Sequence, residues 1–142
     1  MNKRLLRDCL RISQNNLHKH PEFSCNTGSY YHWSFIVQRN KIVEYATNST
    51  GKPPKILGAY YKRGMWDDFI PKRHSEYNCY MKAKGLLIRN ESWEIVNIRL
   101  RYNGVMAMSQ PCTCCHNFMH DVGCSKCFFS TDMGFAKIQI GD

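Results

Sequence analysis

The chain has 142 residues, a formal net charge of +9 and hydrophobic residues at 43% of its positions. This length suits one domain with one core. No apolar run is long enough for a membrane helix and the N-terminal residues lack a signal peptide's apolar stretch, so we expect a cytoplasmic protein with no membrane partner. The positive charge favours polyanions or phosphorylated small molecules as partners, with a solvated basic surface as the alternative. In a reducing compartment the eight cysteines are better explained as metal ligands or small core residues than as a disulfide framework.

The first half of the chain predicts one helix and two strands. Apolar residues at helical spacing predict an amphipathic helix over about the first seventeen residues. Aromatic and β-branched residues predict strands over 29–38 and 41–47, and Arg39-Asn40 between them suits a tight hairpin turn. Glycines and prolines interrupt any periodicity over 49–73, which predicts a long loop of a kind that is often functional.

The second half predicts a helix over 75–87, a strand over 93–102, a helix opened by Pro111 and ended by Gly123, and strands over 126–130 and 136–140. The order α-β-β-loop-α-β-α-β-β predicts a single α/β domain over 1–142, built as a three-layer α/β/α sandwich with a mixed sheet of five strands. Only the short segment 131–134 separates the last two strands, so we expect the last strand to run antiparallel to its neighbour.

Two of the predicted helix starts carry residues that bind zinc. They read Arg73-His74-Ser75-Glu76 and Gln110-Pro111-Cys112-Thr113-Cys114-Cys115. The spacing of Cys112 and Cys115 puts both thiols on one face of a first helical turn, where the helix N-terminus favours thiolates. One imidazole and two thiolates leave a fourth position for water, which is typical of catalytic zinc. We therefore predict Zn²⁺ bound by His74, Cys112 and Cys115, with Glu76 within reach of the water.

This pair of motifs resembles the H-x-E and P-C-x-x-C signature of the cytidine and deoxycytidylate deaminase superfamily. The resemblance covers roughly residues 29–140 and includes the element order. It implies a cytidine-deaminase-like fold and a zinc-dependent hydrolase that converts cytosine to uracil, with adenine or guanine as the alternative base. Glu76 would move protons between the activated water, the base and the leaving amine. By position it also implies that the Ser75 N–H and the Gln110 carbonyl bind the base and that Asn48 binds the sugar. The alternative for Asn48 is a plain turn residue.

The substrate is less well defined by the sequence. Segment 49–73 interleaves basic and aromatic residues, which favours single-stranded DNA or RNA, and the candidate contacts are Tyr60, Tyr61, Lys62, Arg63 and Trp66. An antiparallel last strand together with a histidine ligand points the same way within the superfamily. If the aromatics only pack the loop, the alternative is an enzyme for free cytidine or deoxycytidylate, a pyrimidine nucleotide. A second alternative is a non-catalytic, zinc-stabilised nucleic-acid-binding module. Many relatives are oligomers, so homo-oligomers are among the expected states.

The remaining cysteines and histidines are interpreted as ordinary residues. A structural zinc knuckle would use Cys124 and Cys127 as its second pair, but we interpret both, and Cys114, as small packing residues. His32 is among the histidines to which we assign no role. A second zinc near His18, His20 and Cys25 is a weaker hypothesis.

Overall fold

The computed structural model describes residues 1–17, 31–48 and 74–141. Its centre is a mixed six-stranded sheet in the order β2-β1-β3-β5-β6, with β4 paired to β3 beside this path. β1 (Tyr31–Gln38) and β2 (Lys41–Thr47) form an antiparallel hairpin, and β3 (Trp93–Leu100) lies antiparallel to β1. β5 (Cys124–Thr131) lies parallel to β3, and β6 (Gly134–Gln139) returns antiparallel to β5. The expected antiparallel last strand is therefore confirmed.

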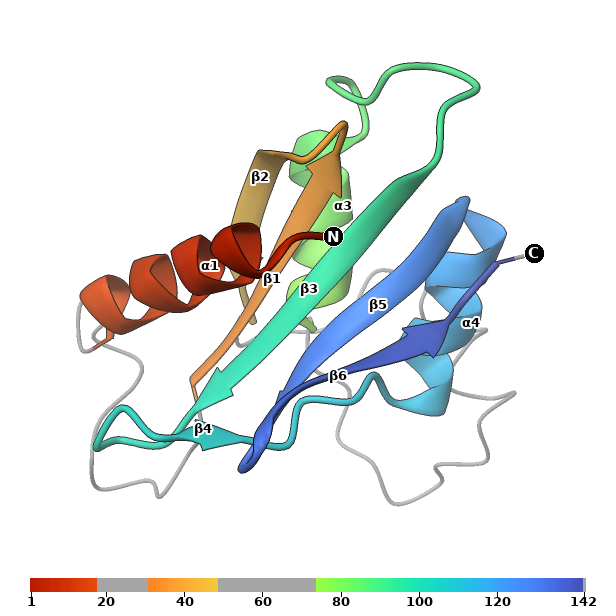
Figure 1. Ribbon diagram of the computed structural model, residues 1–142. Helices are drawn as coiled ribbons and strands as arrows, with labels where there is room; N and C mark the ends of the chain where they lie inside the picture. The colour runs from red at the N-terminus through yellow and green to blue at the C-terminus, as the bar shows by residue number, and fades with distance from the viewer. Residues whose placement is uncertain (18–30, 49–73, 142) are drawn as a thin grey trace.

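Helices cover both faces of this sheet (Figure 1). α1 (Lys3–Asn16) packs on one face, where Leu5 and Cys9 meet the inward side chains of β1 and β3. α3 (Ser75–Ala83) and α4 (Thr113–Asp121) cover the other face and contact each other. Side chains alternate across a strand, so β1 sends Trp33 and Phe35 towards α1 and Ile36 towards the layer of α3 and α4. The α/β sandwich follows from these two separate cores.

The sheet has one strand more than the five that the sequence predicts. The extra strand is β4 (Met106–Ala107), which pairs with the last two residues of β3. Two residues are too few to show an alternating pattern of apolar and polar side chains, so the sequence does not predict this strand. β4 leads directly into the segment that precedes α4.

Two helix boundaries also differ from the prediction. α4 begins at Thr113 and not at Pro111, because Cys112 has an extended backbone (φ −67°, ψ 164°) and serves as the N-cap. α3 ends at Ala83, four residues before the predicted end at 87. Leu86 beyond it is 60% exposed, so the apolar periodicity there buries no further turn of helix.

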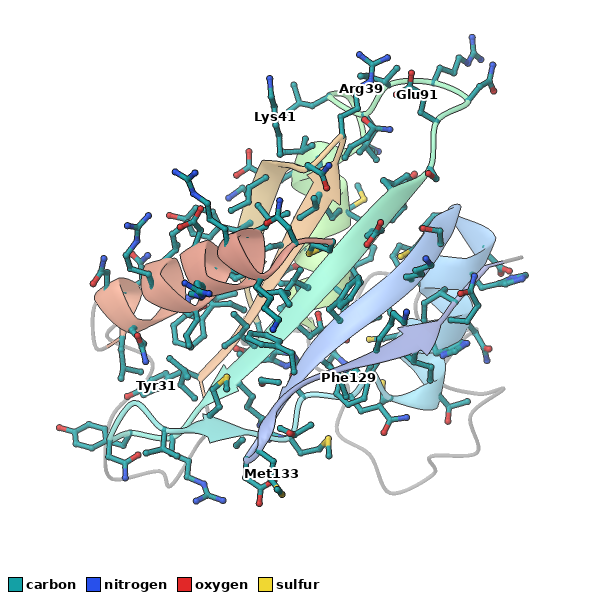
Figure 2. The ribbon with its side chains drawn as sticks, viewed as in Figure 1. Tyr31, Arg39, Lys41, Glu91, Phe129 and Met133 are labelled. Carbon is teal, nitrogen blue, oxygen red and sulfur yellow. The ribbon has the colours of Figure 1, made fainter. Side chains whose placement is uncertain are left out.

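The hairpin turn lies where the sequence predicts it. Arg39 and Asn40 both have positive φ, of 54° and 58°, which matches the turn type whose twist suits a two-residue hairpin. The Arg39 guanidinium reaches Glu91 across the end of the sheet, with Nε 2.7 Å from Oε2 (Figure 2). In the part of the chain that the structure describes, no helix is long and apolar enough to span a membrane.

Candidate metal centre

The two motif helices begin side by side on the same face of the sheet. His74 is the N-cap of α3, and Cys112 is the N-cap of α4. Cys115 lies one turn later, and its backbone N–H donates to Cys112 Sγ at 3.4 Å. Since α3 and α4 contact each other, the two helix starts bring one imidazole and two thiols into one group.

The three side chains have the spacing of a tetrahedral zinc set. His74 Nδ1 lies 3.1 Å from Cys115 Sγ and 3.6 Å from Cys112 Sγ. All three candidate ligand atoms lie within 4.8 Å of one another. Ligands at ordinary Zn–N and Zn–S distances in a tetrahedron are separated by roughly 3.5–3.8 Å. The residues therefore fit a zinc ion with small adjustments, and the predicted His74, Cys112 and Cys115 are together.

The thiols of Cys112 and Cys115 have pKa values that are shifted in opposite directions. Hydrogen bonds with the Cys114 and Cys115 thiols, and then the nearby His74, lower the pKa of Cys112 well below that of an ordinary thiol. Hydrogen bonds with Cys112 and Cys114, burial and the charge of Glu76 all raise the pKa of Cys115. A thiolate is therefore favoured at Cys112, in keeping with its place at a helix start. Cys114 contacts Cys112, but it is buried on α4 in the core and is not one of the three grouped residues.

The carboxyl group of Glu76 is buried next to this group. Glu76 is only 1% exposed. Oε2 accepts a hydrogen bond from Asn97 Nδ2 at 3.2 Å, and Oε1 lies 3.2 Å from Ser75 Oγ. Ser75 Oγ lies in turn 2.7 Å from Ser34 Oγ, whose hydroxyl donates to Asn97 Oδ1 at 2.7 Å. Four buried residues from α3, β1 and β3 thus close a ring of polar contacts.

Sequence reasoning missed the two members of this ring that come from the sheet. Ser34 and Asn97 sit directly opposite each other on β1 and β3. Both are fully buried polar residues in the middle of strands whose other buried side chains are mostly apolar. A polar residue in the middle of a predicted core strand is the signal that could have found them.

His32 was also missed, and it lies beside the metal centre. It precedes Ser34 on the same face of β1, and it is close enough for the charges of Glu76, His74 and Cys112 to act on it. Burial is the main reason that the pKa of His32 is lowered, so its ring is neutral near pH 7. Its Nε2 is buried and meets no hydrogen-bonding partner among the described residues.

Asn48, one of the three predicted substrate contacts, is hydrogen-bonded to His32. Its N–H donates to the His32 carbonyl at 3.2 Å, and its buried Oδ1 has no partner within the described part of the chain. Ser75 is fully buried beside Glu76, and Gln110 is exposed directly before Pro111. The predicted contacts to a single-stranded nucleic acid fall outside the described residues, namely Tyr60, Tyr61, Lys62, Arg63 and Trp66.

The other described cysteines are core residues. Cys124 and Cys127 are buried in the cluster under α4, which confirms their interpretation as packing residues. Burial raises the pKa of Cys79, Cys124 and Cys9 to about 12 in each case, so these thiols stay protonated. The hypothetical second zinc site at His18, His20 and Cys25 lies outside the described residues.

Comparison with protein-family models gave no match, and comparison with curated proteins gave no significant one. The geometry of the metal centre therefore carries the functional argument.

Proposed function

We propose that this chain is a zinc-dependent hydrolytic deaminase that converts cytosine to uracil in a single-stranded nucleic acid. The observation that carries the proposal is the buried carboxyl group of Glu76 beside a set of one histidine and two cysteines. A zinc site that only stabilises a fold is normally closed by four protein ligands and needs no buried acid beside it. Three ligands and an acid are the components of hydrolytic zinc chemistry.

His74, Cys112 and Cys115 would hold the metal. Zinc bound by three protein ligands supplies an acidified water as a nucleophile at neutral pH. Glu76 takes one proton of that water at a carboxylate oxygen and delivers it to N3 of cytosine. It then takes the second proton from the same oxygen, once that oxygen is bonded to C4, and gives it to the departing amine. Oxygen from water becomes bonded to C4, the C4–N bond breaks, and the products are uracil and ammonia.

The ring of polar contacts around Glu76 suits a carboxyl group that gains and loses a proton. Ser75 has one hydroxyl proton, and its Oγ lies 3.2 Å from Glu76 Oε1 and 2.7 Å from Ser34 Oγ. A protonated Glu76 can donate to Ser75, which then donates to Ser34. An ionised Glu76 can accept from Ser75 instead. With Glu76 ionised, the Ser34–Ser75 contact has no proton, because Ser34 donates to Asn97. The ring therefore gains a donor for every contact when Glu76 takes up a proton, which supports the role of proton shuttle.

The sugar would lie against Asn48 and His32. An unpaired buried polar group costs free energy, so such groups are expected to find partners when a ligand arrives. Asn48 Oδ1 can accept from a sugar hydroxyl, and the neutral His32 ring offers a further hydrogen bond at Nε2. We assign the Ser75 N–H and the Gln110 carbonyl to the base, as the resemblance implies.

The charge of the chain favours a nucleic-acid strand over a free nucleotide as the substrate. The chain carries a net charge of +9, and segment 49–73 interleaves basic residues with aromatic ones. A polyanion gains more from such a surface than a single nucleotide does.

The test is to incubate zinc-loaded protein with cytidine, deoxycytidine monophosphate, single-stranded DNA and single-stranded RNA, and to measure uracil and ammonia. We expect turnover on a strand that exceeds turnover on the free compounds. Turnover on free compounds alone would make the protein a nucleotide deaminase. Zinc binding with strand affinity and no turnover on any substrate would support the non-catalytic module.

A further inference from the structure

We propose that Asn97 is a positioning residue that, together with Ser34, orients the carboxyl group of Glu76 for proton transfer. This inference rests on the proposed function, because it assigns a partner to the proposed proton shuttle. Asn97 is fully buried, and its Nδ2 donates to Glu76 Oε2 at 3.2 Å. One oxygen of the carboxyl group is thereby held to the central sheet.

The orientation of the Asn97 amide is itself determined by its neighbours. Nδ2 faces two acceptors, Glu76 Oε2 and the Ser109 carbonyl, the latter at 3.4 Å. Oδ1 accepts from the Ser34 hydroxyl at 2.7 Å. Turning the amide over would set its oxygen against two acceptors in a buried place, which is costly. Ser34 therefore helps to keep the donating side of Asn97 towards Glu76.

The position of Asn97 in the sheet makes it a rigid support. It lies on β3, the middle strand, and pairs with Ser34 of β1 and Phe129 of β5. Glu76, in contrast, sits in the first turn of a helix, where fewer backbone hydrogen bonds hold the chain. A hydrogen bond from the middle strand fixes this side chain more firmly than a bond within α3 could.

Asn97 also joins the two motifs of the metal centre. Its amide reaches Glu76 in the α3 motif and the carbonyl of Ser109, which lies three residues before Cys112 in the sequence. Ser109 is held in place because its hydroxyl donates to the Asn97 carbonyl at 2.9 Å and lies 2.8 Å from Ser130 Oγ. A shift of Asn97 would thus move the acid relative to the ligands, while a purely structural asparagine would affect only stability.

The test compares two matched substitutions, Asn97→Asp and Gln38→Glu. Each replaces a buried amide by an acid of nearly the same shape. Gln38 lies on β1 at the end remote from Ser34, where its amide donates to the carbonyls of Ile88 and Glu91. We expect both variants to lose thermal stability. Only Asn97→Asp should lower kcat, by about 10–100-fold, which is the usual loss for residues that orient a metal site without binding the metal. Its KM should stay within about twofold of wild type, and its zinc content should be unchanged.

A second readout does not depend on deaminase activity. In Asn97→Asp two acids face each other, whereas in Asn97→Asp with Glu76→Gln the introduced amide can donate to the introduced acid. The melting temperature of the double variant should therefore exceed that of Asn97→Asp by roughly 3–6 °C. The same Glu76→Gln change added to Gln38→Glu should give no such recovery.

The outcomes separate this inference from the proposed function. A wild-type protein without deaminase activity defeats the proposed function, while recovery in the double variant still shows that Asn97 holds Glu76. Absence of recovery overturns the positioning role whatever the activity, and so does a kcat that falls equally in Asn97→Asp and Gln38→Glu. If Asn97→Asp does not fold, Ser34→Ala replaces it, with Ser13→Ala as its control, because Ser13 is an equally buried serine on α1. Ser34→Ala should then lower kcat several-fold, and an unchanged kcat overturns the inference.

Discussion

At the scale of single residues, the metal centre depends on where each side chain leaves its backbone. His74 and Cys112 are N-caps, with extended backbones immediately before a helix, and Cys115 follows one turn later. The positive end of a helix dipole stabilises a thiolate at such a place. The three candidate ligands are thus placed by helix starts, and the carboxyl group of Glu76 by the buried ring around Asn97.

The first prediction concerns the ligands. Cys112→Ala and Cys115→Ala should each remove zinc from a protein that otherwise carries about one zinc per chain, because two protein ligands bind the ion far more weakly than three. Elemental analysis after gel filtration measures this. Cys127→Ala is the matched control, since Cys127 is fully buried but is not among the grouped ligands. It should keep zinc and lose only stability; loss of zinc in this control alone would contradict the assignment.

The second prediction separates the acid from the metal. Glu76→Gln should retain zinc and fold normally, yet lose turnover by at least about 100-fold, because an amide cannot take up and release the proton. Zinc content and uracil formation are measured on the same preparation. Wild-type turnover in this variant would exclude Glu76 as the shuttle.

At the scale of elements, the β1–β2 hairpin is held by a turn with two left-handed residues. Asn tolerates positive φ well, whereas β-branched residues do not. The turn also places Arg39 so that it reaches Glu91, next to β3. β1 of this hairpin also pairs with β3, which places Ser34 opposite Asn97.

The third prediction tests this turn. Asn40→Val should lower the free energy of unfolding by about 1–2 kcal/mol, because a β-branched side chain is strained in the left-handed conformation that Asn tolerates. Urea denaturation measures the change. Lys41→Val, at the exposed first residue of β2, should have little effect. Equal losses in both variants would show that the turn conformation is not the cause.

At the scale of the whole molecule, charge is the property that bears on the substrate. The exposed face of α1 carries arginines on the side of the sheet opposite to the candidate metal centre (Figure 1). Lys62 and Arg63 belong to segment 49–73 and lie outside the described residues. Comparison of these two groups can therefore separate net charge from local contact.

The fourth prediction uses that comparison. Affinity for single-stranded DNA should fall steeply with salt, and Lys62→Ala with Arg63→Ala should reduce the logarithmic salt slope by about 0.7 per lost phosphate contact. Arg4→Ala with Arg7→Ala removes the same charge from α1 and should leave the slope nearly unchanged. Trp66→Ala should weaken binding by about 1–3 kcal/mol if a base stacks on its ring. Fluorescence anisotropy over a salt series measures all three. A lower melting temperature with unchanged affinity would instead make Trp66 a packing residue.

Local patterns were sufficient for every described element except β4 and for the two motifs that carry the candidate ligands. The periodicity of α1, the turn residues Arg39 and Asn40, and the two motifs that hold His74, Cys112 and Cys115 each depend on neighbours close in the sequence. The short link between β5 and β6 likewise leaves only one direction for the last strand. The role of Glu76 and the substrate stay predictions.

Pairing across the sheet decided the rest. β4 is defined only by its pairing with β3. The role of Asn97 likewise depends on Ser34 of β1 and Glu76 of α3, which lie on either side of its amide. His32 lies beside the metal centre for the same reason, although it stands 42 positions before His74 in the sequence. Such contacts join residues far apart along the chain, and no local pattern of hydrophobicity or turn chemistry encodes the distance between them.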